Sequence, residues 1–171
     1  MEALFNEAAR VGVDPTTVAD LRRRVGSAPR GRFRLCLHGG PEAPIHEMLI
    51  VLSRGSYIRP HRHPHGKVET YLILEGVLDL YFFDGVGRPD GRIPLSSFAA
   101  GGTFIYRTAE PVWHMPMAAS ADVVYYEVFT GPFRKDADVE YAPWSPAEDD
   151  ELGARTFLER LGACPVEGLA H

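Results

Sequence analysis

The sequence predicts a mainly β protein, an antiparallel sandwich or barrel with a helical segment at each end. About eight short apolar runs lie between residues 46 and 129, separated by Gly, Pro and Asp turns. No helical periodicity interrupts these runs, which argues against a βαβ arrangement. Fourteen prolines and seventeen glycines among 171 residues suit a turn-rich architecture better than a helical one.

The composition narrows the class of protein. Hydrophobic content of 45% and charged content of 24% are ordinary for a soluble globular domain. A formal net charge of -5 argues against nucleic acid as a partner. No apolar run approaches the roughly 20 residues that span a bilayer, and the acidic N-terminus is unlike a secretory signal. With only Cys36 and Cys164, no disulfide framework is expected. We therefore expect a cytoplasmic protein without nucleic-acid or membrane partners.

The chain divides into three parts of a single domain. Residues 1–30 form an N-terminal helical segment, and residues 31–133 form the β-barrel. Residues 134–171 form an acidic loop and a C-terminal helix, which is predicted to pack on the barrel. The final residues, after Cys164, are expected to fray.

Two helical regions are predicted from apolar spacing. Residues 2–25 read as helical in two pieces, and Asp14 or Thr16 can cap the second piece. The face of the first piece consists of Leu4, Ala8 and Val11. Residues 147–162 carry leucines at helical spacing after a Ser-Pro start. The C-terminal helix is expected to pack on the outside of the β core.

The predicted strands are short and closely spaced. They are 32–38, 46–53, 56–63, 70–74, 77–83, 92–95, 104–106, 113–116 and 123–129. In the first of these, alternation puts Cys36 and His38 on one side, where both could face an interior. A small buried hydrophobe is the plainer interpretation of Cys36.

One stretch, residues 55–76, combines histidines with a carboxylate. His61 and His63 are two residues apart, so on a strand their side chains leave the same face. Glu69 follows a short polar connection containing Gly66, where a hairpin could bring it back beside them. Two imidazoles and a carboxylate on one face form the beginning of a divalent metal site.

A fourth ligand is expected from His114, which begins a later β segment. Three imidazoles and one carboxylate leave one or two positions open on a six-coordinate metal, where water, a substrate oxygen or dioxygen can bind. Iron, manganese, nickel and zinc all accept this donor set. His65 shares parity with His61 and His63 and could replace one of them. Its place in a polar loop favours an exposed imidazole, or a side chain that contacts a metal ligand without binding the metal itself.

Five further residues are candidates for a substrate pocket. Tyr57 and Arg59 share a strand face with His61, and Tyr71 shares one with Glu69. Arg59 could pair with a carboxylate or phosphate of a ligand, or equally with a carboxylate of the protein. The tyrosines could donate hydrogen bonds to a ligand, although packing is the plainer interpretation. Weaker candidates are Arg107 and His46. No catalytic residue can be named.

The pattern Gly55-x5-His61-x-His63-x5-Glu69-x6-Gly76 resembles the first cupin motif, and the region ending at His114 resembles the second. A wider set of segments resembles the WbuC family of cupin-fold metalloproteins across about residues 30–150. These segments are Tyr57 to His63, Phe82-Phe83-Asp84-x-x-Gly87, Trp113-His114, Glu127-x3-Gly131-Pro132-Phe133 and Ala142-Pro143-Trp144-Ser145-Pro146.

The resemblance implies a cupin-type antiparallel jelly-roll barrel with flanking N-terminal and C-terminal helices. It further implies one metal near the barrel centre, held by His61, His63, Glu69 and His114. A metalloenzyme acting on a small polar metabolite, a sugar or a small acid, is one expected function. The alternative is a non-catalytic module that binds or senses a small molecule. Small barrels of this kind often pair, so a homodimer is also expected.

Overall fold

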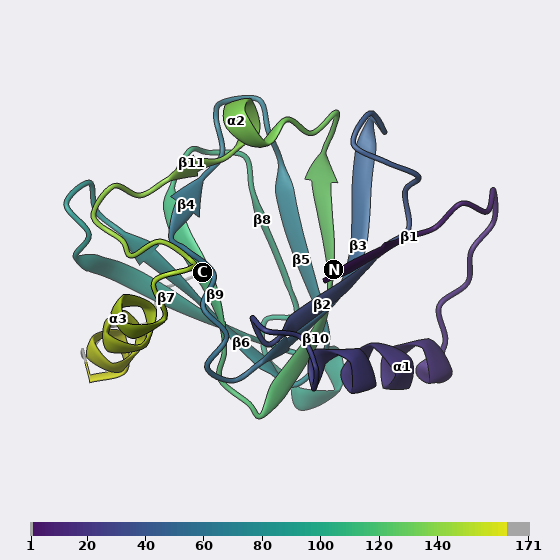
Figure 1. Cartoon of the computed structure of the whole chain (residues 1–171), viewed down its shortest axis with the longest axis horizontal. Helices are drawn as coiled ribbons and strands as arrows, with labels where there is room; N and C mark the ends of the chain where they lie inside the picture. The colour runs from purple at the N-terminus through teal and green to yellow at the C-terminus, as the bar shows by residue number, and fades with distance from the viewer. Residues whose placement is uncertain (1, 164–171) are drawn as a thin grey trace.

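The computed structural model describes residues 2–163, which form two facing β-sheets with helices on their outer sides (Figure 1). The larger sheet has the order β1 (Ala3–Phe5), β2 (Arg32–Cys36), β3 (Ile45–Ser53), β10 (Asp122–Thr130), β5 (Glu69–Glu75) and β8 (Ile105–Thr108). The smaller sheet has the order β11 (Glu140–Tyr141), β4 (His61–Arg62), β9 (Trp113–Ala118), β6 (Val77–Phe83) and β7 (Pro89–Ser96). This is the mainly β sandwich that the strand spacing predicts, in the jelly-roll form that the cupin resemblance implies.

All pairs of neighbouring strands are antiparallel except β1 with β2, in the part of the chain that the structure describes. Along β10, Tyr125 lies opposite Ile50 of β3, and Glu127 lies opposite Met48. Side chains of alternate residues therefore point between the sheets, where the main core packs. This core includes Cys36, Met48, Ile50, Leu52, Tyr71, Ile73, Leu78, Leu80, Phe82, Ile93, Leu95, Ala118, Val123 and Tyr125.

The second predicted N-terminal helix is confirmed as α1 (Pro15–Val25). Asp14 is its N-cap and accepts a hydrogen bond from the backbone N–H of Thr17 at 2.9 Å. Proline at the first helical position suits the helix because its missing N–H would have no partner there. The apolar face of α1 packs on the outer side of β2 and β3.

The first predicted N-terminal helix is wrong, because residues 3–5 form strand β1, paired in parallel with β2. The edge of β2 offers unpaired backbone groups, and a segment that pairs there satisfies its own N–H and C=O groups as well. Pairing at an existing edge thus outweighs a weak helical pattern whose apolar residues are too few to bury a face.

The predicted C-terminal helix is confirmed as α3 (Glu151–Ala163). It covers the outer face of the smaller sheet, well away from α1 (Figure 1). It packs on the aromatic residues Tyr57, Tyr81, Phe83, Trp113 and Trp144, and Phe157 of α3 contributes to the same cluster. The short helix α2 (Lys135–Asp138) and the 3-10 turn η1 (Phe98–Ala100) complete the elements. The predicted frayed end after Cys164 lies outside the described residues. Within those residues, no helix is long and apolar enough to cross a membrane.

The predicted strand over residues 56–63 is extended only at its end, where β4 spans His61–Arg62. Pro60 lacks an N–H to donate to a neighbouring strand, and its carbonyl accepts from the N–H of Ala142 at 2.9 Å. The other predicted strands from residue 46 onward are present, with ends that differ by at most three residues. Residues 56–60 therefore run as a loop that delivers His61 to the sheet.

Gly76, in the turn between β5 and β6, has no room for a side chain. Its φ is +80°, a region that L-residues rarely adopt. A Cβ there would lie within van der Waals distance of the Asp122 carbonyl oxygen and 3.1 Å from the Cα of Val123. Both are backbone atoms of β10, so relief requires the sheet to shift.

We expect Gly76→Ala to lower the free energy of unfolding by about 3 kcal/mol, from left-handed strain together with the clash. Gly66→Ala is the matched control, because Gly66 has a φ of +88° but nothing within 4 Å of a Cβ. It should cost only about 1 kcal/mol. Chemical denaturation of the two variants measures the difference. Equal losses would show that the clash with β10 contributes nothing.

Candidate metal centre

The three histidines and the glutamate predicted as ligands meet between the sheets. β4 supplies His61, the residues directly after it supply His63, β5 supplies Glu69 and β9 supplies His114. Each offers one nitrogen or oxygen atom, and these four atoms all lie within 4.8 Å of one another. Strand pairing brings two of these side chains side by side, because His61 of β4 is the direct partner of His114 of β9. The structure thus brings together four side chains from separate elements.

Local sequence explains why both histidines of the His-x-His motif turn inward. The intervening Arg62 points outward, where its guanidinium binds Glu140 at 2.7 and 2.9 Å. The same guanidinium lies over the ring of Trp113, 4.4 Å from its centre. These contacts hold the two-residue strand β4 against β9 and β11, so the alternation persists across a very short strand.

Each of the three imidazoles is oriented by a backbone carbonyl. The Nδ1 atoms of His61, His63 and His114 lie 2.9, 2.8 and 3.0 Å from the carbonyl oxygens of Arg59, Asp138 and Val112 respectively. A carbonyl can only accept, so Nδ1 carries the hydrogen, and Nε2 of a neutral ring presents a lone pair. Metal-binding histidines are commonly held in this way.

Within the described residues, two of the opposite ring edges have no hydrogen-bond partner. Nε2 of His63, Nε2 of His114 and Oε2 of Glu69 are buried without one. Buried polar atoms are nearly always paired, so three unpaired atoms at one point call for an explanation. A divalent cation supplies one, since imidazole nitrogen and carboxylate oxygen are ligands of transition metals. The residues present therefore fit a metal ion.

Electrostatic coupling within the cluster is strong. Nε2 of His63 lies 3.4 Å from Oε1 of Glu69, and Nε2 of His114 lies 3.1 Å from Oε2. Burial alone would raise the pKa of Glu69, but His114 and His63 outweigh it and hold that pKa well below its ordinary value. Burial, and then His114, lower the pKa of His61 to about 3. Burial also opposes protonation of His63, yet Glu69 raises the pKa of that ring. The carboxylate is therefore ionised.

A cavity of about 600 Å³ extends from the cluster along the inner face of the larger sheet. His61, His63 and Glu69 lie on its wall, as do side chains from β1, β2, β3, β5 and β10. Its polar lining away from the cluster includes Arg32, Arg34, His38, His46, Tyr71, Tyr125, Glu127 and Lys135. A volume of this size is typical of a site for a small molecule.

Glu127 is the cavity residue whose importance the sequence reasoning missed. It lies opposite Tyr71 of β5, two residues along β10 from Phe129, which pairs with Glu69. Burial, and then the negative charge of Glu69, raise the pKa of Glu127 to about 8. Its carboxyl group is therefore protonated at neutral pH. The signal was present in the sequence, because Glu127 shares an otherwise apolar strand face with Val123, Tyr125 and Phe129.

Two of the five predicted pocket residues line the cavity, Tyr71 and His46. Burial and then Glu69 raise the pKa of Tyr71 well above its ordinary value, so its phenol remains a hydrogen-bond donor. The ring of His46 packs against His38 with centroids 4.0 Å apart, and its Nε2 lies 3.1 Å from the carbonyl oxygen of Pro41.

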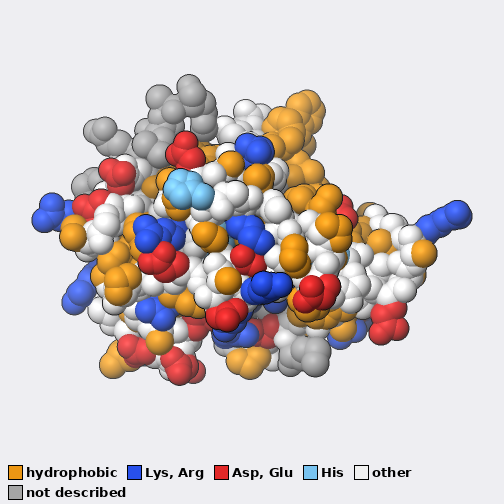
Figure 2. Space-filling view, turned by 90° about the horizontal axis from the view of Figure 1, so that it is seen from above, with side chains coloured by type: hydrophobic (Ala, Val, Ile, Leu, Met, Phe, Trp, Pro, Cys, Tyr) orange, Lys and Arg blue, Asp and Glu red, His pale blue; other side chains and the backbone are white. Residues whose placement is uncertain are grey.

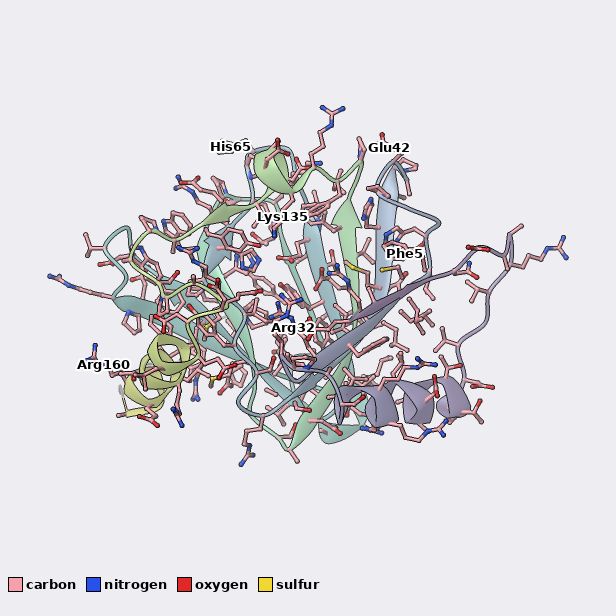
Figure 3. The ribbon with its side chains drawn as sticks, in the orientation of Figure 1. Phe5, Arg32, Glu42, His65, Lys135 and Arg160 are labelled. Atoms are coloured by element: carbon pink, nitrogen blue, oxygen red, sulfur yellow. The ribbon has the colours of Figure 1, made fainter. Side chains whose placement is uncertain are left out.

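The other three predicted pocket residues lie outside the cavity lining. The Arg59 guanidinium donates to Ser145 Oγ and to the Ala142 carbonyl, and the Tyr57 hydroxyl donates to the Pro146 carbonyl. Pro60 and the loop geometry of residues 56–60 break the alternation that would have aimed them inward. Arg107 is exposed on β8. His65 is exposed in the loop after β4, at the end of the molecule that carries α2 (Figure 3).

Figure 2 views the molecule from this same end, where basic and acidic side chains are interspersed with hydrophobic ones. Among the described side chains, charges of both signs alternate across this face, so it carries no single-sign patch (Figure 2). The charges that matter for a ligand are therefore those that line the cavity.

Comparison with protein families gives one match. The model of a family described as a domain of unknown function, DUF6016, matches residues 13–95. No curated protein sequence matches the chain.

Solved structures show the fold clearly. A Shewanella oneidensis protein superposes with a TM-score of 0.56 at 12% identity, covering 88% of this chain and 97% of its own. An oxalate oxidase in complex with the substrate analogue glycolate gives 0.51 at 13% identity, covering 81% of this chain and 69% of its own. A recombinant oxalate oxidase with glycolate gives 0.50 at 13% identity, covering 68% of this chain and 58% of its own. The chain thus spans less than two thirds of that last protein. The fold of this chain is the cupin-type jelly roll with flanking helices.

Proposed function

We propose that this chain is a metal-binding cupin protein in which His61, His63, Glu69 and His114 hold one divalent transition metal ion. Iron, manganese, nickel and zinc all suit the donor set. One observation carries the proposal: three carbonyl-oriented imidazoles and a carboxylate converge, and buried donor atoms at the point of convergence have no protein partner.

The first candidate function is a metalloenzyme acting on a small polar metabolite, a sugar or a small acid. A bound metal would polarise a substrate oxygen or, in the case of iron, bind dioxygen. The chain's own groups would orient the substrate beside it. Tyr71 would donate a hydrogen bond from its phenol, and Glu127 would donate one from its protonated carboxyl group. Apolar residues of the core would exclude water from the inner end of the cavity.

A non-catalytic module that binds or senses a small molecule is the second candidate. The observation that favours it is the protonated state of Glu127, whose pKa burial and Glu69 raise to about 8. A protonated carboxyl group cannot remove a proton, so the cavity would lack a general base of its own.

Metal content measured by elemental analysis tests the proposal. Protein purified without added metal is expected to carry close to one transition metal ion per chain. His61→Ala and His114→Ala should each lose most of it, whereas the control His65→Ala, in the exposed loop, should keep it. Full occupancy in both ligand variants would refute the assignment. Oxygen consumption and product analysis on a panel of sugars and small acids then separate the enzyme from the binding module.

We further propose kinship with the WbuC family, supported by the motifs of residues 57–63, 113–114 and 127–146. The expected partners are a small molecule and a second copy of the chain, and the expected location is the cytoplasm. Exposed edge strand β8 supports the homodimer proposal, because its outer backbone groups are free to pair. Sedimentation velocity at several concentrations tests it.

A further inference from the structure

Arg34 is a solvent-exposed arginine at the cavity wall, and no partner of its guanidinium is found among the described residues. It lies on the inner side of β2, opposite Ile50 of β3, which in turn pairs with Tyr125 of β10. Among the described residues, its guanidinium makes no hydrogen bond, ion pair or ring contact. Its charge nevertheless reaches the cavity. Burial raises the pKa of Tyr125 and that of Glu127, and Arg34 opposes the rise in both.

The neighbouring arginines, by contrast, are neutralised. Arg32 binds both carboxylate oxygens of Glu148 at 2.8 Å and the Tyr57 carbonyl at 2.9 Å. Arg30 binds Glu148 at 2.8 Å and also pairs with Glu2. Figure 3 shows Arg32 between the two sheets, where these pairs close one side of the cavity. Arg34 thus lacks, among the described residues, the carboxylate partner that Arg30 and Arg32 each have.

The cavity holds further polar groups that the protein leaves free. Among the described residues, the hydroxyl group of Tyr125 and the carboxyl group of Glu127 have no hydrogen-bond partner. Lys135, from α2, also lines the cavity and makes no ion pair, although its ammonium lies 6.0 Å from the ring centre of Tyr141. Polar groups that face a cavity without protein partners are those on which a ligand depends for its orientation.

From these groups we infer that the cavity binds a polyhydroxy carboxylic acid, a sugar acid, whose carboxylate is held by Arg34 while its hydroxyl end reaches the four-residue cluster. The inference rests on the proposed function, because the cluster is the candidate metal centre. A guanidinium presents parallel N–H groups that match the two oxygens of a carboxylate. The free hydroxyl and carboxyl groups of Tyr125 and Glu127 lie between the two ends and suit the hydroxyls of such a chain.

The length of the ligand follows from the sheet register. The row that contains Arg34 and Tyr125 and the row that contains Glu69 are four residues apart along β10, about 13 Å, and Arg34 lies three strands from Glu69 across the sheet, about 14 Å more in that direction. The arginine side chain covers part of this span, and the ligand must cover the rest. A two-carbon acid is too short to touch both ends, so the ligand must be a longer acid.

Charge favours a carboxylate over a phosphate. Glu69 faces the same cavity as an ionised carboxylate and would oppose the second charge of a phosphate monoester. One planar guanidinium is sufficient for a monoanion. A neutral sugar, in turn, would leave Arg34 without a partner in the bound state.

Binding of D-gluconate and D-glucitol, measured by isothermal titration calorimetry, tests the inference. The two probes differ only in the carboxylate, which glucitol replaces with a hydroxymethyl group. We expect gluconate to bind wild-type protein at least 10-fold more tightly than glucitol. Arg34→Met should weaken gluconate binding by about 10- to 100-fold, the loss expected for a hydrogen bond to a charged group, and should leave glucitol binding unchanged. Arg34→Lys should give an intermediate loss.

Arg107→Met is the matched control, because Arg107 is an exposed arginine on β8 outside the cavity lining. It should bind gluconate as the wild type does, and thermal unfolding should show that both methionine variants fold. Equal binding of gluconate by wild type and Arg34→Met, equal binding of the two probes, or no binding of either would overturn the inference. Tighter binding of glucitol 6-phosphate than of gluconate would overturn the choice of carboxylate.

Metal content of the same samples distinguishes failure of this inference from failure of the proposed function. One metal ion per chain without Arg34-dependent binding overturns the inference alone. Absence of metal from the wild type, even after incubation with excess divalent cation, overturns the proposed function, whatever gluconate does.

Discussion

Divalent metal is expected to raise the melting temperature of the metal-free protein by roughly 8–16 °C when free metal is about a thousand times its dissociation constant. A ligand that binds only the folded state adds about 4 kcal/mol to the free energy of unfolding at that concentration. For a chain of this size, each kcal/mol raises the melting temperature by about 2–4 °C. The folded state alone assembles the four donor atoms, because they come from β4, β5, β9 and the loop after β4.

His114→Ala should abolish this metal-dependent shift. His114 is 2% exposed, so no water can take its place without also entering the core. Thermal unfolding of chelator-treated protein, with increasing zinc or manganese, measures the shift. His65→Ala, which alters an exposed loop histidine, should retain the full shift. A shift in His114→Ala equal to that of the wild type would show that the metal binds elsewhere.

Titration of Glu127 is expected to lower the stability of the metal-free protein between pH 5 and pH 8. In the folded protein the pKa of Glu127 is about 8, because burial and the charge of Glu69 disfavour its ionised form. In the unfolded chain the pKa of a glutamate is near its ordinary value of about 4.3. Below that pH both states are protonated, and the contribution of Glu127 to stability is fully present. Above it only the unfolded chain releases the proton, so stability falls until the pH passes the folded pKa.

The loss attributable to Glu127 is on the order of 3–5 kcal/mol, since each unit of pKa difference corresponds to about 1.4 kcal/mol. Glu127→Gln keeps the shape of the side chain but removes the titration. The difference in free energy of unfolding between wild type and variant should therefore change with pH. Urea denaturation of both proteins at intervals from pH 5 to pH 9 measures it.

The neighbouring groups are separable from Glu127 in this experiment. The lowered pKa of Glu69 acts below its ordinary range, so its contribution is already complete at pH 5. The raised pKa of His63 also lowers stability as the pH rises, but it does so in both proteins. Stability curves for wild type and Glu127→Gln that run parallel across this range would show that Glu127 is ionised in the folded state.

Much of the fold follows from local pattern. The short apolar runs 46–53, 77–83 and 123–129, bounded by turn residues, predict strands that the structure contains. Asp14 followed by Pro15 predicts the start of α1, because cap and proline act within one turn. These predictions succeed because the forces involved depend on residues close in sequence.

The metal ligands could be predicted for a related reason. His61 and His63 share a strand face by simple alternation, and Glu69 follows after a short connection. His114 needed the further assumption that a later strand returns beside the first, which pairing of β4 with β9 provides. Arg59 shows where alternation ends. Residues 56–60, directly before His61, form a loop, and the guanidinium of Arg59 binds the segment around Ala142 and Ser145 instead.

The sequence by itself determined the strand pattern, the caps and turns, and the residue types able to bind a metal, because each depends on the periodicity of a short segment. Only the tertiary structure decided that residues 3–5 add a strand to β2, that Glu127 keeps its proton beside Glu69, and that Arg34 faces the cavity unpaired. Edge pairing, desolvation and charge coupling all act between residues distant in sequence. Their strength depends on a separation in space that no local pattern encodes.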